Sequence, residues 1–239
     1  MARSVAFRLP LAVVVVAAIA AIAASAAAAD ISGPCTASIA NQNVKGRGTG
    51  AFSDAITVKK DSVVPVTMSA ASQISHLKIE IEFAGMRWTV RDKPSHGKSW
   101  ASSVDVNKYA KYGVGLYKVI GSSSGGVSCS GSALVKVEGN PLSTVAGIVG
   151  LVAALAGLGG IGAAVAMTMR AGALSFGRSL AGAIFGLIAG LGLAVLFQEY
   201  SVIYPTLSAA VSEVGLGGLF GIGLVFIGKL VGGSVAVPD

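Results

Sequence analysis

The sequence predicts a mixed membrane protein, in which an all-β sandwich over residues 30–141 precedes a three-helix bundle over residues 142–239. First, 53% of the 239 residues are hydrophobic and only 12% are charged, whereas about one quarter of the residues in soluble domains are charged. Second, residues 30–141 hold 13 Lys and Arg against 8 Asp and Glu, but residues 142–239 hold only three of each sign. Third, the hydrophobic pattern changes between these two parts from alternation to long apolar runs.

Residues 1–29 are predicted to be a cleavable signal peptide. Arg3 and Arg8 precede the apolar run LAVVVVAAIAAIAA, and Ala27 and Ala29 form the small-residue pattern that signal peptidases accept. We expect cleavage after Ala29 and export of the domain that follows. An uncleaved anchor helix is the alternative.

The two cysteines, Cys35 and Cys129, both lie in the exported part. In an oxidising compartment an even pair of this kind favours a disulfide over a metal or redox site. A disulfide would close the loop from Cys35 to Cys129. In the chain-entropy model, closing a loop of this length stabilises a domain by about 4 kcal/mol. The sequence contains no CxxC motif and neither histidine has zinc-ligand spacing, so no metal site and no cofactor are expected.

Short strands with intervening turns are predicted through the exported part. The segments LKIEIEF (77–83) and MRWTVRD (86–92) alternate apolar and polar residues and read as a hairpin. The loop residues of PSHG and SSSGG are expected to separate further strands. These further strands are predicted over residues 54–60, 63–69, 99–106, 113–121 and 127–139. Seven strands with one apolar face each favour a two-layer β-sandwich.

One segment near the end of this part carries a narrower resemblance. The pattern Gly115-x-Tyr117-x-Val119 resembles the tyrosine-corner region of immunoglobulin-like domains. The resemblance implies an immunoglobulin-like sandwich. The chain departs from antibody-type domains because Cys129 falls on the last predicted strand, so that Cys35 would tie the first strand to the last. No family is identified from these few residues.

Catalytic signals are weak. Ser95, His96 and Ser99 are adjacent, but a nucleophile needs a base, an orienting group and an oxyanion site that converge in space. Glu80 and Glu82 are predicted to lie with Lys78 on the solvent-facing side of a strand, where they need no catalytic role. We therefore expect no enzyme, and a membrane-surface Ser/His hydrolase is the second alternative function.

A contact surface for a partner is predicted in the segment NKYAKYG. Tyr109 and Tyr112 are flanked by Lys108 and Lys111, and aromatic residues are enriched in contact surfaces. The alternative is that these tyrosines pack the corner of the sandwich. The net charge of +7 suits an anionic surface, but no basic run exceeds two residues, so a nucleic-acid partner is not expected.

Three apolar stretches are long enough to cross about 30 Å of hydrocarbon. They cover about residues 142–169, 180–197 and 214–231. Arg170 and Arg178 flank the first loop, Lys229 lies near the last helix end, and Glu199 and Glu213 border the second loop. The positive-inside rule places that loop and the C-terminus in the cytoplasm, and the exported domain outside. We expect a multi-pass protein of the plasma membrane.

Glycines recur at helical spacing in the last two stretches. Gly182, Gly186 and Gly190 are four residues apart, as are Gly217 and Gly221. Such a stripe lets another helix approach closely, which is how helices associate in lipid. The stripe, a glycine zipper, is expected to contact either this chain's own helices or another subunit.

These features predict a non-catalytic integral membrane subunit or scaffold of a bacterial cell-envelope complex, whose β-sandwich contacts a partner. The expected partners are the lipid bilayer and other membrane subunits, or further copies of the chain that associate through the glycine-rich faces. A component of a channel or transporter is the first alternative. A proton-coupled carrier is disfavoured because no charged residue falls in the middle of a predicted span.

Overall fold

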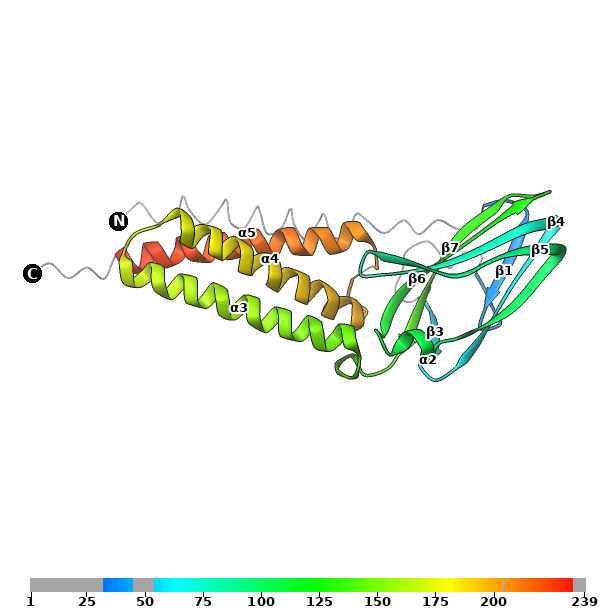
Figure 1. Cartoon of the computed structure of the whole chain (residues 1–239), viewed down its shortest axis with the longest axis horizontal. Coiled ribbons are helices and arrows are strands. Elements are labelled where there is room, and N and C mark those ends of the chain that lie inside the picture. The colour runs from blue at the N-terminus through cyan, green and yellow to red at the C-terminus, as the bar shows by residue number, and fades with distance from the viewer. Residues whose placement is uncertain (1–31, 45–53, 204, 234–239) are drawn as a thin grey trace, which may run out of the picture. The chain divides into compact units, whose positions relative to one another are not determined.

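The computed structural model describes residues 32–44, 54–203 and 205–233 (Figure 1). The predicted signal peptide and its cleavage site lie outside these residues. The described chain divides into two compact units. The first, here called the β unit, contains the residues up to Gly150 together with Val195–Leu207. The second, the helical unit, contains Leu151–Ala194 and the residues from Ser208 onward.

The β unit is built on one seven-stranded sheet. Its strands are β1 (Cys35–Ile39), β2 (Gln42–Asn43), β3 (Ile56–Lys59), β4 (Val63–Phe83), β5 (Met86–Asp105), β6 (Gly115–Gly125) and β7 (Cys129–Glu138). The order is β2-β1-β4-β6-β7-β3, and β5 pairs with β4. All pairs are antiparallel except β3 with β7. A short helix, α2 (Asn107–Ala110), follows β5.

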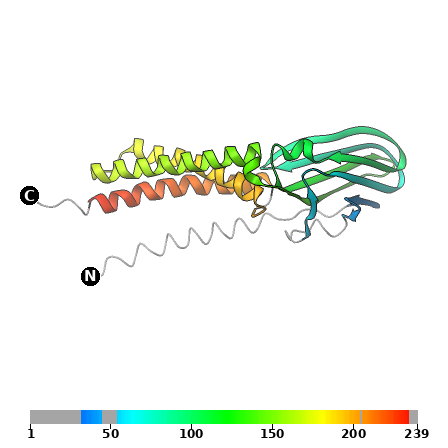
Figure 2. The same ribbon diagram turned by 90° about the horizontal axis from the view of Figure 1, so that it is seen from below.

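The long strand β4 bends the sheet into a barrel-like shape. Its first part pairs with β1, and its second part, from Ile74 onward, pairs with β6. Between these parts the register with β5 shifts at Ser69–Ile74 and again at His76. Irregularities of this kind bend a strand and increase its twist. The curved strands are visible in Figure 2, and the apolar inner faces form the core.

The strand boundaries correct several sequence predictions. Residues 63–69 and 77–83 belong to one strand, β4, and residues 86–92 and 99–106 fall almost entirely in one strand, β5. The predicted turn PSHG lies inside β5, and the serines of SSSGG extend β6. Pairing with β4 holds both segments in extended form, so tertiary contacts override their turn propensity. The immunoglobulin-like sandwich is not confirmed, since all seven strands belong to one hydrogen-bonded sheet.

Two local predictions for this unit are confirmed. The hairpin turns at Ala84 and Gly85, where Phe83 faces Met86. Both turn residues have positive φ, +48° and +73°, as a two-residue hairpin turn with matching twist requires. Cys35 and Cys129 form a disulfide that joins β1 to β7, with their Cα atoms 6.2 Å apart.

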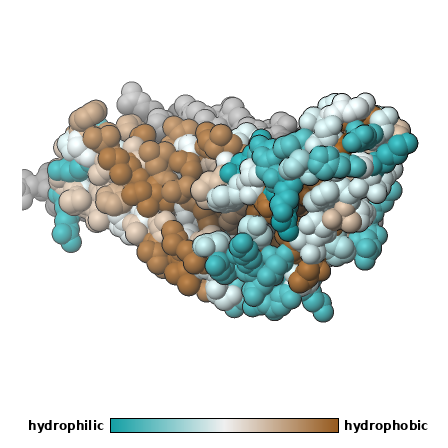
Figure 3. Space-filling view, turned by 45° about the vertical axis from the view of Figure 1, so that its right-hand side comes forward, coloured by the Kyte–Doolittle hydropathy of each residue, from teal (hydrophilic) through white to brown (hydrophobic). Residues whose placement is uncertain are grey.

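Three long apolar helices complete the described chain, as predicted. They are α3 (Val145–Ala171), α4 (Phe176–Glu199) and α5 (Leu207–Gly233). Each is long and apolar enough to cross a membrane, and hydrophobic surface covers them in Figure 3, whereas hydrophilic residues gather on the β unit. The last helix begins at Leu207 rather than near residue 214, so Glu213 lies within it rather than in the preceding loop.

In the helical unit, the predicted packing glycines lie where α4 meets α5. A Cβ atom on Gly182 would come within 2.9 Å of the carbonyl oxygen of Gly221. A Cβ atom on Gly186 would collide with the carbonyl oxygen of Gly217, and one on Gly190 would lie 2.7 Å from that of Glu213. The two backbones approach each other so closely that only hydrogen fits between them.

Candidate functional site

A polar cluster lies where the end of α4 is built into the β unit. Gln198 is 1% exposed and Glu199 is 3% exposed. The backbone N–H of Ala84, in the β4–β5 turn, donates to Gln198 Oε1 over 2.6 Å, and Gln198 Nε2 donates to the carbonyl oxygen of Leu116 over 3.0 Å. One side chain therefore links the hairpin turn to strand β6.

Glu199 makes a second set of links in the same cluster. Its carboxylate accepts hydrogen bonds from the Val114 N–H, over 3.1 Å, and from Thr144 Oγ1, over 3.0 Å. Thr144 also caps the N-terminus of α3 by accepting from the Gly147 N–H over 2.9 Å. From the sequence alone, Glu199 is expected to be a charge at the border of a loop. The local pattern at this position is a Gln-Glu pair at the end of an apolar run. Such a pattern does not reveal hydrogen-bond partners that lie far away in the sequence.

Gly115 allows this close approach. A Cβ atom there would collide with the backbone carbonyl oxygens of Gln198 and Glu199. Its φ of +89° is also a conformation that residues with a side chain rarely adopt. Glycine is therefore the residue that fits at this position.

Replacing Glu199 with alanine is expected to lower the free energy of unfolding by about 2 kcal/mol, because the buried Val114 N–H loses its acceptor. The Thr144 hydroxyl loses one of its two acceptors and keeps the carbonyl oxygen of Pro141. The matched control is Glu138→Ala, at an exposed glutamate of the same unit, which is expected to change little. The measurement is thermal unfolding of the full chain in mild detergent. Equal stability of the two variants would contradict the prediction.

An open hollow of about 610 Å³ lies next to the polar cluster. We call it the mouth hollow. The β4–β5 hairpin, α2, β6 and the first turns of α3 supply its walls. Its main lining residues are Ile81, Phe83, Met86, Trp88, Tyr109, Tyr112, Tyr117, Val145 and Val149. Ile81 lies directly opposite both Trp88 and Val119 in the register, so the hollow continues the inner face of the sheet.

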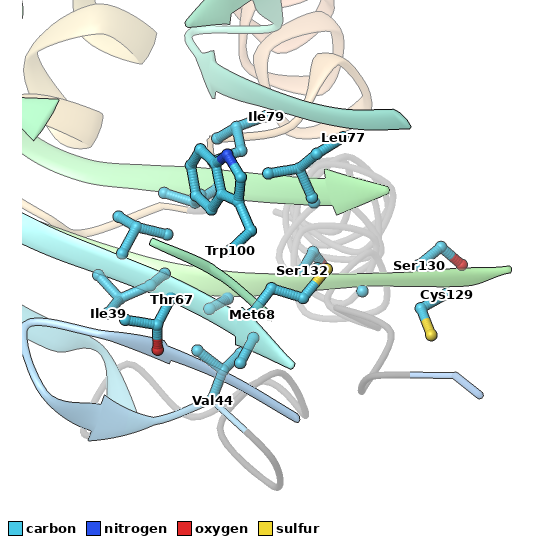
Figure 4. A pocket seen from close by; sticks show the side chains of 16 residues that line it. Ile39, Val44, Thr67, Met68, Leu77, Ile79, Trp100, Cys129, Ser130 and Ser132 are labelled. Atoms are coloured by element: carbon cyan, nitrogen blue, oxygen red, sulfur yellow. The ribbon is translucent and has the colours of Figure 1, made fainter. Parts of the chain in front are cut away.

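Two smaller apolar cavities lie behind the mouth hollow. The middle cavity, of about 80 Å³, shares Ile81, Tyr109 and Tyr117 with the hollow. The inner cavity, of about 50 Å³, shares Ile79 and Val119, among others, with the middle one. Figure 4 shows the inner cavity, with Trp100, Ile79 and Leu77 on one side and Ile39 and Val44 on the other. The three spaces form a row through the interior of the β unit.

Tyr117 stands between the mouth hollow and the polar cluster. Its hydroxyl donates to the carbonyl oxygen of Gly113 over 2.6 Å, and its ring stacks on Phe83 with centroids 4.7 Å apart. Burial, and to a smaller extent the Glu199 carboxylate, raise the pKa of the Tyr117 phenol well above its ordinary value. Tyr117 thus remains a protonated donor. This short backward hydrogen bond is the local feature of a tyrosine corner.

The four residues predicted for partner contact gather around α2. Tyr109 is half-buried and lines both the mouth hollow and the middle cavity, and Tyr112 is 58% exposed at the hollow. Lys108 and Lys111 are exposed, and the Lys111 ammonium lies 4.9 Å from the centroid of the Tyr112 ring. Tyr117 also packs inside the β unit, and the choice between partner contact and packing for Tyr109 and Tyr112 stays a prediction.

The candidate catalytic residues are not brought together. Ser95 is buried and His96 is exposed, because neighbouring residues in a strand point to opposite faces. His76 Nε2 instead lies 2.7 Å from Asp92 Oδ1 at the surface. Among the described residues, no group of three His, Cys, Asp or Glu side chains could hold a metal ion.

The carboxylates Glu80 and Glu82 face basic partners. Lys78 Nζ lies 2.9 Å from Glu80 Oε1, and the Arg87 guanidinium lies 3.3 Å from Glu82 Oε2. Each glutamate is thus placed in an ion pair. The solvated strand face expected from the sequence is wrong for Glu82, which is only 7% exposed.

Comparison with known proteins gives distant structural likenesses. No protein-family model and no curated protein matches the sequence. A lytic polysaccharide monooxygenase (LPMO) from Kitasatospora papulosa matches with a TM-score of 0.29 and 7% identity, over 36% of this chain and 52% of that one. A lytic polysaccharide monooxygenase from Jonesia denitrificans matches with a TM-score of 0.24 and 8% identity, over 35% of this chain and 58% of that one. The chain spans little more than half the length of these structures.

Proposed function

We propose that the chain is a non-catalytic integral membrane subunit, or scaffold, of a bacterial cell-envelope complex. Residues 1–29 act as its signal peptide, the β unit is exported, and the C-terminus lies in the cytoplasm. The three apolar helices and the disulfide support this reading, since disulfides persist in oxidising compartments.

The observation that carries the proposal is the way in which α4 ends. Residues Val195–Leu207, which join two candidate spans, belong to the β unit, and Gln198 and Glu199 are hydrogen-bonded inside it. One span would suffice to tether an exported domain. Three spans whose connecting segment is part of the domain's own fold suit a subunit that positions this domain within a larger assembly.

The helices contribute the intramembrane part of the proposal. We assign to the glycines of α4 and α5 the role of a glycine zipper that holds these two helices together. A Cβ atom on Gly159 or Gly162 of α3 would meet no atom of the described residues within 4 Å. This open face of α3 is then available to the helix of another subunit or of a second copy.

The outer edge of β5 is the proposed contact for a protein partner. This strand is 20 residues long, and no strand among the described residues pairs with its outer edge. The middle of this strand carries Lys93, Pro94 and Lys98. Lysine and proline on an edge strand hinder the addition of further strands and so prevent aggregation. The part from Ser99 to Val104 carries no charge, so it suits an extended partner segment added as a further strand.

The test is affinity purification of the full chain from native membranes in mild detergent, followed by mass spectrometry and native sizing. One or more membrane proteins are expected to co-purify in a fixed ratio. The double variant Ala101→Lys/Ser103→Lys, on the open edge of β5, is expected to lose the partner, whereas Thr57→Lys, an exposed position of β3, is expected to keep it. A chain that purifies alone would overturn the subunit proposal. A partner retained by the β5 variant would overturn only the assigned surface.

A further inference from the structure

We propose that the mouth hollow and the middle cavity bind one acyl chain of an anionic phospholipid, whose phosphate lies against Lys108 and Lys111. This inference goes beyond the proposed subunit role. It rests on membrane attachment alone and does not require a protein partner.

The first argument is the chemistry and continuity of the lining. Aliphatic and aromatic side chains dominate the walls of the hollow, and Ile81, Tyr109 and Tyr117 also line the middle cavity behind it. An apolar cavity without polar partners does not hold water well and accepts apolar guests. The shared residues place the middle cavity directly next to the hollow, and a flexible hydrocarbon chain suits two adjacent apolar spaces of this kind.

The second argument is the position of the hollow along the chain. Val145 and Val149, in its wall, belong to the first turns of α3, and α3 is a candidate membrane span. The N–H groups of Val145 and Ala146 donate to the carbonyl oxygens of Lys111 and Tyr112, over 3.2 and 2.8 Å. These bonds hold the end of the α2 segment at the point where α3 begins. If α3 crosses the bilayer, the start of α3 lies at the depth of the lipid headgroups.

The third argument is the pairing of aromatic rings with positive charge at this depth. Trp88 and Tyr112 are 42% and 58% exposed at the hollow, and such rings favour the membrane–water interface. Lys108 and Lys111 are exposed beside them, and none of the described residues that line the hollow carries a carboxylate. Asp105, the nearest acidic residue in the sequence, accepts a hydrogen bond from the Asn107 N–H over 3.1 Å. Two lysines beside an apolar entrance complement a lipid that has an anionic headgroup.

The two tryptophans of the chain provide the probe. Trp88 lines the mouth hollow, and Trp100 lines the inner cavity. In Trp100→Phe, emission therefore reports on the hollow alone. The delipidated full chain in detergent would be titrated with phosphatidylglycerol that carries bromine on its acyl chains, since bromine quenches tryptophan on contact. We expect quenching that saturates at one lipid per chain.

The charge and the site are tested by matched variants in the same Trp100→Phe background. Lys108→Glu/Lys111→Glu is expected to weaken the binding of brominated phosphatidylglycerol about tenfold or more. Lys60→Glu/Lys136→Glu, at exposed lysines away from the hollow, is expected to leave it unchanged. Brominated phosphatidylcholine is expected to bind about as weakly to the parent chain as phosphatidylglycerol does to the first variant. Circular dichroism checks that each variant is folded.

Quenching that rises without saturation, or that is the same for both lipids and both variants, would overturn the inference. The inference would also be overturned if a protein from the affinity purification blocked the quenching when added to the titration, because that protein would then be the occupant of the hollow. The titration uses the isolated chain, so its failure leaves the subunit proposal standing. Conversely, a chain that purifies without partners can still bind the lipid.

Discussion

Replacing Gly217 with leucine is expected to force α5 away from α4 and to lower the stability of the helical unit by about 3 kcal/mol. A Cβ atom at this position would lie 2.7 Å from the Cα atom of Gly190 and would collide with the carbonyl oxygen of Gly186. Both obstacles are backbone atoms, which no change of rotamer can remove. The measurement is the thermal unfolding of the full chain in mild detergent.

The same helix supplies the control. Gly215 lies two residues before Gly217, and within the part of the chain that the structure describes a Cβ atom there would meet nothing within 4 Å. Gly215→Leu is therefore expected to unfold at nearly the temperature of the parent chain, although both changes add the same side chain to α5. If the two variants were equally destabilised, the cost would come from leucine in this helix and not from the α4–α5 contact.

Removing the disulfide by Cys35→Ser/Cys129→Ser is expected to destabilise the β unit by about 4 kcal/mol, or roughly 20 °C in its unfolding temperature. The two cysteines are 94 residues apart and join β1 to β7, so their bond restricts a large part of the unfolded chain. Without it, β1 is held mainly through its pairing with β4 and β2. Near-UV circular dichroism during heating reports this transition.

Reduction provides an independent check of the disulfide prediction. A reductant is expected to lower the unfolding temperature of the parent chain toward that of the double variant, and to leave the double variant unchanged. A variant as stable as the oxidised parent would show that sheet pairing and core packing alone hold the β unit together.

Several features follow from local sequence. The three apolar helices were predictable because crossing hydrocarbon depends on the length and composition of one continuous run. The hairpin at Ala84 and Gly85 was predictable because two alternating segments flank two small residues. The disulfide was predictable because only Cys35 and Cys129 are present in the chain.

Other features were decided by the tertiary structure. Residues 94–97 have the composition of a turn, yet they continue β5 because Pro94 and Gly97 pair with His76 and Ile74 of β4. Glu199 looked like a charge at a loop border, and its partner Val114 lies 85 residues away. No local pattern reports such a contact.

The candidate site combines both kinds of information. Tyr109, Tyr112, Lys108 and Lys111 were noticed in the sequence as an aromatic and basic segment. The sequence did not show that this segment borders a hollow, because the other walls come from the β4–β5 hairpin, β6 and the start of α3. The composition and length of single segments determined the three apolar helices and the hairpin of this protein. Only the folded chain determined the sheet order, the buried Glu199 and the mouth hollow, because each of these depends on contacts between residues that are far apart in the sequence.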